Sequence, residues 1–557
     1  MVVCAAEYDV NQDGTGDFAV IQDAIDAAVH GDVIVVHPGT YCENIHFRGK
    51  NITLRSLDPE NEDIVASTVI EALDRRRRSV VTFDGTEDET CLLSGFTITN
   101  GQTFGFAQGG GILGGGPWSD EHLRTLAGIR NCTIKGNSAT GPYGGGGGLS
   151  WCGGPISSCT ITGNSAENWG GGVYQCSGTI ADCMISDNSA GWRGGGLCNC
   201  YGTISNCIIS QNAVTHEYGH GGGLAGCSGE ISNCTITDNW ADDGGGLLYC
   251  HGLISNCTIS HNSATGEHGE GGGFSWCQGT ISSCAITDNS AWLGGGLFSC
   301  CGPIANCTIT GNEASSGGGI YLGYFIDWHC VVLNSVMWGD TPDEIAGYTA
   351  LATVTYSDVD GGWTGTGNIS NDPLLVSGPL GDYYLSCTAA GQEADSPCID
   401  AGSGTAESLG LDKLTTRTDS AADSGIVDMG YHYPLAIDQN PQINCSINAS
   451  EFTPGDELVG FVEAHNPGPD ISVDAYVAFI LPDGAIFSFT GGGLVLGIYP
   501  WIAEVILPGG FEFGPSGVFR TTVPESPGDY AFAAVFTVPG SFEFIGDPSL
   551  FSFVITD

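Results

Sequence analysis

The chain has 557 residues, of which 14 are Lys or Arg and 63 are Asp or Glu, so its formal net charge is −49. This surplus of acid argues against nucleic-acid binding, which needs basic groups to displace phosphate counterions. Glycine supplies 89 residues, but without a period of three, which excludes collagen. The 41% apolar content argues against bulk disorder.

The 24 cysteines predict an oxidising compartment, and therefore a secreted or cell-surface protein with disulfides. The alternative is a set of buried free thiols, because cysteine is among the most buried residue types. The sequence contains no run of 18 apolar residues, so we expect no membrane span.

Residues 1–130 are expected to form an N-terminal cap and the first turns of the fold. Apolar residues at Phe18, Ile21, Ala24, Ile25 and Ala28 have helical spacing, which predicts a capping helix near 18–29.

The same region contains a candidate Ca²⁺ loop, because its oxygen-bearing residues have the spacing that opens such loops: Asp9, Asn11, Asp13 and Asp17. Val20 stands where the closing glutamate of a Ca²⁺ loop belongs. A structural role without metal is therefore the alternative, and no cofactor is required.

Residues 131–319 carry a repeat of 23 to 27 residues that reads roughly I-S-N-C-T-I-T-x-N-S-A, a variable loop, then G-G-G-L. One cysteine recurs in every unit, which gives a first column: Cys132, Cys159, Cys183, Cys207, Cys234, Cys257, Cys284 and Cys307. A second cysteine precedes the next first-column cysteine by seven residues: Cys152, Cys176, Cys200, Cys227, Cys250, Cys277 and Cys300. Such self-similarity is typical of a solenoid.

Short alternating runs such as Cys234-Thr235-Ile236-Thr237 predict strands, and Gly and Asn mark turns between them. The expected fold is all-β: a right-handed parallel β-helix in which like residues stack from turn to turn. The recurrent asparagine before Ser-Ala tolerates a left-handed turn conformation, and stacked Asn amides can form a hydrogen-bonded ladder. Gly-Gly-Gly permits positive φ and close backbone approach at another corner.

Residues 320–434 read as irregular late turns of the same β-helix. From 435 to 557 the cysteines nearly stop, and alternating runs such as Leu458-Val459-Gly460-Phe461-Val462 lie between turn signals. This pattern predicts a second domain, a β-sandwich of Ig-like type.

Several stretches resemble a known family. Asp13-Gly14-Thr15-Gly16-Asp17-Phe18 and Ile21–Ala28 are similar to the opening of pectin-lyase-fold proteins, and the Gly-Gly-Gly-Leu units are similar to bacterial right-handed β-helix repeats, including those of polymorphic outer-membrane proteins. Ser396–Gly402 with Val427–Tyr431 resembles the closing turns of large secreted bacterial β-helix proteins. The resemblance implies the fold, while its members include lyases, hydrolases, esterases and proteins without assigned chemistry.

The variable loops before Gly-Gly-Gly carry the candidate ligand-binding residues, which are aromatic: Tyr143, Trp169, Trp192, Tyr218, Trp240 and Trp292. Stacked one turn apart, they would form a stripe suited to the apolar faces of an extended sugar chain. The alternative is that each ring only covers bare glycine backbone.

Two of these loops are three or four residues longer than their shorter neighbours. With the unit between them, they contain His and carboxylate residues that form a second metal candidate: His216, Glu217, His220, Asp242, Asp243, Glu267, His268 and Glu270. The alternative is an acidic, solvated rim.

The cysteine columns are expected to be structural, because the repeat lacks the tight C-x-x-C pairs of zinc sites. Their disulfides could close within one turn, as in Cys152–Cys159, or join neighbouring turns, and both remain open.

No catalytic residue is identified. We expect a binding or structural role, as an adhesin or in recognition of an extended glycan; the alternatives are a polysaccharide lyase or glycoside hydrolase, and a self-associating subunit of a surface assembly or filament.

Overall fold

The computed structural model describes residues 5–73, 78–104, 109–115, 124–323 and 329–435, and beyond these 442–449, 451–454, 456–466, 471–482, 485–490, 493–496, 498–507, 511–522, 528–537 and 544–555. The chain divides into two compact units, 1–433 and 434–557. Each unit is described by itself.

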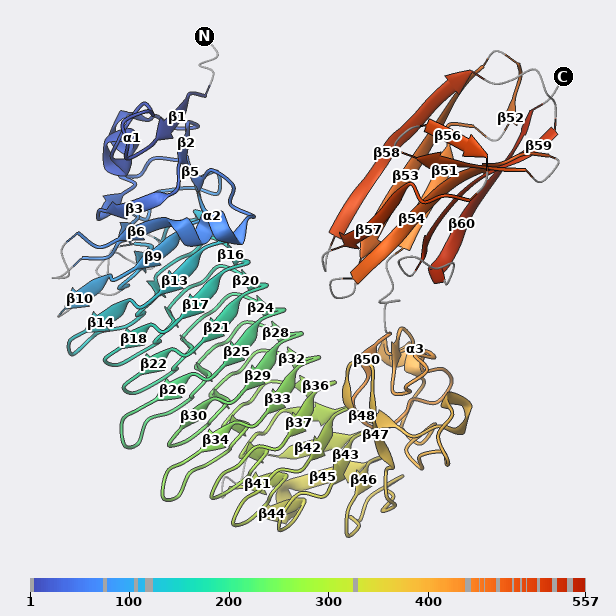
Figure 1. Ribbon diagram of the computed structural model, residues 1–557. Helices are drawn as coiled ribbons and strands as arrows, with labels where there is room; N and C mark the ends of the chain where they lie inside the picture. The colour runs from blue at the N-terminus through green and yellow to red at the C-terminus, as the bar shows by residue number, and fades with distance from the viewer. Residues whose placement is uncertain are drawn as a thin grey trace. The chain divides into compact units, whose positions relative to one another are not determined.

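The first unit is a parallel β-helix, as expected, in which each turn contributes a short strand to each of up to four sheets (Figure 1). One regular turn shows the order: β16 (Ile156–Ser157) lies in sheet 1, β17 (Thr160–Thr162) in sheet 2, β18 (Ser165–Ala166) in sheet 3 and β19 (Val173–Tyr174) in sheet 4. Over the described residues, the sheets have 14, 13, 7 and 12 strands respectively, and all these neighbouring strands pair in parallel.

Sheets 1 to 4 extend over most of the first unit. Sheet 1 runs from β1 (Glu7–Val10) to β45 (Ala352–Thr355), and sheet 2 from β3 (Gly39–Cys42) to β46 (Asp358–Val359). Sheet 3 runs from β10 (Gln102–Phe104) to β34 (Ser263–Ala264), and sheet 4 from β4 (Ile45–His46) to β44 (Ile345–Gly347). The region predicted to hold irregular late turns therefore supplies the last strands of three sheets.

The interior is a set of columns in which one residue type repeats. Ile156, Ile180 and Ile204 stack in sheet 1, and Ile161 and Ile185 stack in sheet 2, all fully buried. Burial of an aliphatic side chain contributes about 1.5 to 3 kcal/mol, so a column of identical residues stabilises each turn in the same way. This is why a short unit with little core of its own folds when stacked.

The recurrent asparagines form a continuous ladder between sheets 2 and 3. Asn188 donates from both its backbone N and its Nδ2 to Asn212 Oδ1, each at 3.0 Å, and its Nδ2 also donates to the carbonyl of Ile161 at 2.8 Å. The expected ladder is thus present. The left-handed conformation, however, lies one residue earlier than expected, as at Asp187 and Gln211, both with φ of 55°.

The Gly-Gly-Gly corner needs glycine for two reasons. Gly194 has a φ of 63°, and a Cβ on Gly195 would lie 2.5 Å from the carbonyl oxygen of Gly222 in the next turn. The corner therefore brings backbone against backbone between turns, which confirms the role expected for these glycines.

Both cysteine columns lie inside the β-helix, in consecutive turns, and the structure contains no disulfide among the described cysteines, so the expected disulfides stay a prediction. Two longer α-helices accompany the N-terminal turns. α1 (Ile21–Ala27) packs against β1, β2 (Val33–Val36) and β4 at the N-terminal end, as the expected cap, and α2 (Glu62–Ser67) packs against β6 (Thr68–Glu71) and β9 (Thr97–Thr99). Among the described residues, no helix combines the length and apolar character needed to cross a membrane.

The described strands of the second unit pair in antiparallel fashion, apart from one parallel pair. β51 (Gln442–Ile447), β53 (Glu457–Asn466) and β58 (Phe511–Thr522) form one sheet, and a larger sheet includes β54 (Ile471–Ile480), β59 (Gly528–Thr537) and β60 (Phe544–Ile555). Buried residues of both sheets, among them Val462 and Phe532, share one core. A β-sandwich is therefore confirmed, while its Ig-like type stays a prediction.

Candidate functional site

The candidate site lies where the variable loops enter Gly-Gly-Gly, between sheets 3 and 4. Isolated parallel bridges hold one loop residue per turn in register, which places Trp169, Arg193, His220 and Asp243 in consecutive turns. Glu270 takes the next place, because its backbone N–H donates to Asp243 Oδ1 at 3.0 Å and its carbonyl accepts from Gly244. We call Arg193, His220, Asp243 and Glu270 the charged column.

Short polar contacts connect His220, Asp243 and Glu270 within the charged column. His220 Nδ1 lies 3.2 Å from Asp243 Oδ2, and both side chains are about a quarter exposed, at 28% and 26%. Glu270 Oε2 accepts a hydrogen bond from Trp276 Nε1 at 3.0 Å. Burial is the main cause that raises the pKa of Glu270, Asp243 adds to the rise, and the bond from Trp276 opposes it.

The six aromatic residues predicted to bind ligand do gather at these loops, but they do not form one stripe. Trp169 shares its register with Arg193, whereas Trp240 lies on β30 (Trp240–Ala241) in register with Ala213 and Ser263. Trp192 directly precedes Arg193 in the chain and therefore occupies a third position. The loops differ in length, so the offset from the asparagine does not fix the register at Gly-Gly-Gly.

The aromatic residues make different local contacts. Tyr143 and Trp169 have ring centroids 6.5 Å apart, and Trp169 stacks on Tyr174 at 5.8 Å. Trp192 stacks on His216 at 3.9 Å. The remaining side chains stay open to solvent: exposure is 67% for Tyr218, 47% for Trp292 and 42% for Trp240.

The residues of the second metal candidate are divided between two places. His220, Asp243 and Glu270 meet in the charged column, with Asp242 beside them, while His216, Glu217, Glu267 and His268 lie exposed at the loop tips. In the described segments, no group of three or more His, Cys, Asp or Glu side chains has the arrangement of a metal site.

The polar groups of the N-terminal Ca²⁺ candidate have partners within the protein: Asp9 Oδ1 lies 3.1 Å from His37 Nε2, and the other three residues bond within their own loop. Asp13 Oδ1 accepts from the Thr15 backbone N at 2.8 Å and from its hydroxyl at 2.6 Å, and these bonds lower the pKa of Asp13. Asn11 donates to Thr15 Oγ1 at 2.9 Å, and Asp17 accepts from the backbone N of Asp9 at 3.0 Å. The structural role is therefore sufficient to explain these residues.

A second aromatic row was not anticipated. Tyr249, Trp276, Phe298 and Tyr321 come from consecutive turns beside sheet 4, with successive ring centroids 6.4, 5.4 and 5.5 Å apart. The sequence pattern that could have predicted this row is an aromatic residue two or three positions after Gly-Gly-Gly in consecutive units. Trp276 brings this row into contact with the charged column through Glu270.

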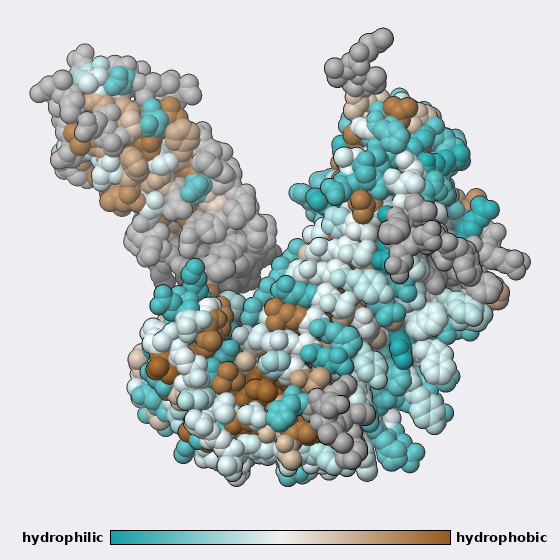
Figure 2. Space-filling view, turned by 180° about the vertical axis from the view of Figure 1, so that it is seen from behind, coloured by the Kyte–Doolittle hydropathy of each residue, from teal (hydrophilic) through white to brown (hydrophobic). Residues whose placement is uncertain are grey.

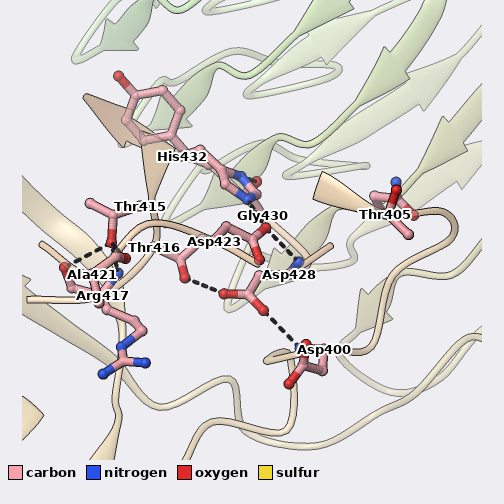
Figure 3. Close-up of polar contacts among 12 residues, drawn as sticks. Asp400, Thr405, Thr415, Thr416, Arg417, Ala421, Asp423, Asp428, Gly430 and His432 are labelled. Atoms are coloured by element: carbon pink, nitrogen blue, oxygen red, sulfur yellow. Dashed lines mark hydrogen bonds and ion pairs between the residues drawn. The ribbon is translucent and has the colours of Figure 1, made fainter. Parts of the chain in front are cut away.

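A buried polar cluster in the closing turns is structural (Figure 3). Asp428 accepts from the backbone N of Asp400 at 2.7 Å and from the Thr416 hydroxyl, and its own N donates to Asp423. Asp423 also contacts His432 Nε2 at 2.8 Å, and both side chains are almost fully buried. The cluster joins the segments around residues 400, 416 and 428. The segments around 400 and 428 are those that resemble the closing turns of secreted bacterial β-helix proteins.

Replacing Asp428 by alanine is expected to destabilise the first unit by about 3 kcal/mol, because it leaves the buried Thr416 hydroxyl and the partly buried Asp400 amide without an acceptor. Urea unfolding of the full chain measures this loss. Asp412→Ala removes an exposed aspartate of the same region and is expected to change stability little. Equal stability of the two variants would contradict the structural role.

Comparison with known proteins supports the fold. The family described as right-handed beta helix region matches residues 175–325, and the Chlamydia polymorphic membrane protein repeat matches residues 158–175. No curated protein matches the chain.

Solved structures show only distant similarity. A pectin methylesterase from Erwinia chrysanthemi is 11% identical, with 67% of this chain and 92% of that chain covered and a TM-score of 0.21. A tailspike of an Acinetobacter phage is 13% identical, with 86% and 78% covered and a TM-score of 0.31. Similarity this weak says nothing about activity.

Proposed function

We propose that the chain is a secreted or surface-displayed binding protein whose loop edge between sheets 3 and 4 takes an extended, neutral polysaccharide. The observation that supports this most is the set of exposed rings at that edge, of which Tyr218, Trp240 and Trp292 are more than 40% exposed. Exposed rings offer stacking faces for sugars, and the carboxylates of the charged column accept hydrogen bonds from hydroxyl groups. The charge of −49 disfavours an acidic polymer.

Exposure at the surface is supported by two features. The match to a polymorphic membrane protein repeat falls within the β-helix, and the cysteine content suits an oxidising compartment.

Figure 2 shows mostly hydrophilic and neutral residues over the visible face of the β-helix unit, with hydrophobic residues in small patches. Such a surface favours a polar ligand over an apolar one.

Binding is tested with the double variant Trp192→Ala/Trp292→Ala, titrated with cellohexaose, chitohexaose and polygalacturonate. We expect the wild type to bind one of the neutral oligosaccharides and not polygalacturonate, and the double variant to bind about tenfold more weakly or worse. Isothermal titration calorimetry measures the affinity.

The matched control is Tyr201→Ala, which removes an exposed ring that lies outside the loop edge. Unchanged affinity in this control together with loss in the double variant supports the site. Equal loss in both, or retention of polygalacturonate alone, contradicts it.

A second candidate function is glycoside hydrolysis, favoured by Asp243 and Glu270. They come from consecutive turns, and Asp243 Oδ1 accepts a hydrogen bond from the backbone N of Glu270 at 3.0 Å, so the two carboxylates are neighbours, as a glycosidase requires of its acid and its nucleophile or base. The raised pKa of Glu270 suits a general acid. If the wild type releases reducing ends from a neutral polysaccharide and Glu270→Gln does not, the protein is a glycoside hydrolase. If the wild type binds the polysaccharide without releasing reducing ends, the result supports the binding function instead.

A further inference from the structure

The two cysteine columns have a geometry that favours one disulfide connectivity. In the first column, the backbone N of Cys207 lies 3.5 Å from Cys234 Sγ, and the backbone N of Cys234 lies 3.4 Å from Cys257 Sγ. In the second column, the backbone N of Cys152 lies 3.4 Å from Cys176 Sγ. Each sulfur therefore reaches toward the cysteine of the preceding turn.

The sulfur atoms lie between turns. Cys183 Sγ is 3.8 Å from the carbonyl oxygen of Ile156, and Cys207 Sγ is 3.6 Å from that of Ile180, both one turn earlier. Neighbouring parallel strands are about 4.8 Å apart, which falls inside the Cα separation that a disulfide spans. Partners in neighbouring turns thus need little backbone movement to bond.

Cysteines of one turn are placed differently. Cys152 and Cys159 are separated by β16, whose Ile156 faces the interior between them and is fully buried. A bond within the turn would have to pass this side chain, although the seven-residue spacing had left that pairing open. The structure therefore favours pairing along the columns.

The first column has closed ends, which makes its pairing unique. Phe96 occupies the equivalent place in the turn before Cys132, since Thr133 donates to its carbonyl as Thr160 does to that of Cys132. At the other end, Cys307 N contacts Ser335 Oγ at 3.1 Å, where the other turns offer a cysteine sulfur. The column thus has eight cysteines in a row, with Phe96 at one end and Ser335 at the other. If every cysteine bonds to a cysteine of a neighbouring turn, only one set of four pairs is possible.

We propose that the first column is a staple of four disulfides between successive turns, Cys132–Cys159, Cys183–Cys207, Cys234–Cys257 and Cys284–Cys307. They form by thiol–disulfide exchange with a disulfide-carrying oxidoreductase of the compartment in which the chain folds. Each bond takes two electrons and two protons from a cysteine pair and reduces one donor disulfide to two thiols. The second column has seven members, so if it pairs only within itself it keeps at least one thiol.

The test is peptide mapping of the full chain, purified from an oxidising compartment, alkylated in denaturant and digested without reductant at acidic pH to prevent exchange. We expect cross-linked peptides that join Cys183 to Cys207 and Cys234 to Cys257. Peptides joining Cys176 to Cys183, or alkylation of the whole first column, would overturn the proposal.

The variant Cys183→Ser separates the two connectivities by the thiol it leaves behind. Pairing between turns leaves Cys207 to be alkylated, whereas pairing within a turn leaves Cys176. Cys301→Ser is the matched control, because Cys301 is a partly exposed cysteine outside both columns, and the first column is expected to stay unlabelled. This result does not depend on any ligand of the loop edge.

Discussion

Replacing Asn212 by aspartate is expected to destabilise the β-helix by about 3 to 5 kcal/mol, although the two side chains have the same shape. Asn212 Nδ2 donates to the carbonyl of Ile185 at 2.8 Å and to Asn239 Oδ1 at 3.0 Å. A carboxylate would place an oxygen against both acceptors in a fully buried position. The lost donors and the buried charge act together, so the effect exceeds that of one hydrogen bond.

Urea unfolding at pH 7 measures the change, with Asn256→Asp as the matched control. Asn256 is exposed and has a φ of 53°, a conformation that Asp also tolerates. The control is expected to stay within about 0.5 kcal/mol of the wild type. If both variants unfold at the same urea concentration, the ladder does not stabilise the fold in the way described.

The repeat period was sufficient to predict the stacking of turns. Cys183, Cys207 and Cys234 do lie in adjacent layers, because a constant arrangement of cysteine, isoleucine and asparagine fixes the strand register from turn to turn. The residues that fill the interior recur at the same place in each unit, so each one lies next to its counterpart in the neighbouring turn. Sequence reasoning works well for such positions.

The loop edge was less predictable for a physical reason. The loop between the ladder asparagine and Gly-Gly-Gly varies in length from turn to turn. Counting residues from either end of the loop therefore does not tell which loop residues of neighbouring turns lie side by side. The charged column appears only when the bridges next to Gly-Gly-Gly are known, since they place His220 beside Asp243 and leave Trp192 one position away. The Glu270–Trp276 bond likewise joins two segments whose spacing carries no period.

The asparagine ladder ends in a carboxyl pair, which predicts a pH-dependent stability. Asn312 donates from its backbone N and its Nδ2 to Asp340 Oδ1, at 2.7 and 2.8 Å, and Asp340 N donates to Glu344 Oε1 at 3.1 Å. Among the described residues, no other side chain donates to the buried oxygens Asp340 Oδ2 and Glu344 Oε2, and a hydrogen bond between the two carboxyl groups requires that one of them holds a proton. Burial raises the pKa of Asp340 to about 6 and that of Glu344 to about 10.

The pair therefore holds a proton in the folded state that the unfolded chain releases above its ordinary carboxyl pKa. A folded-state pKa above the unfolded one gives stability that is complete at low pH and is lost as the pH rises toward 10. We expect the wild type to lose stability between pH 5 and pH 9. Glu344→Gln should remove most of this loss, because the amide cannot ionise and offers a donor to Asp340.

At pH 9 the Glu344→Gln variant is expected to be more stable than the wild type by about 2 kcal/mol, and at pH 5 the two should agree within about 1 kcal/mol. Urea unfolding at pH 5, 7 and 9 gives the comparison. Asp343→Asn, which changes an exposed neighbour, should keep the wild-type pH dependence. A Glu344→Gln curve parallel to that of the wild type would mean that Glu344 is already ionised in the folded protein, and the ladder would then end on two buried negative charges.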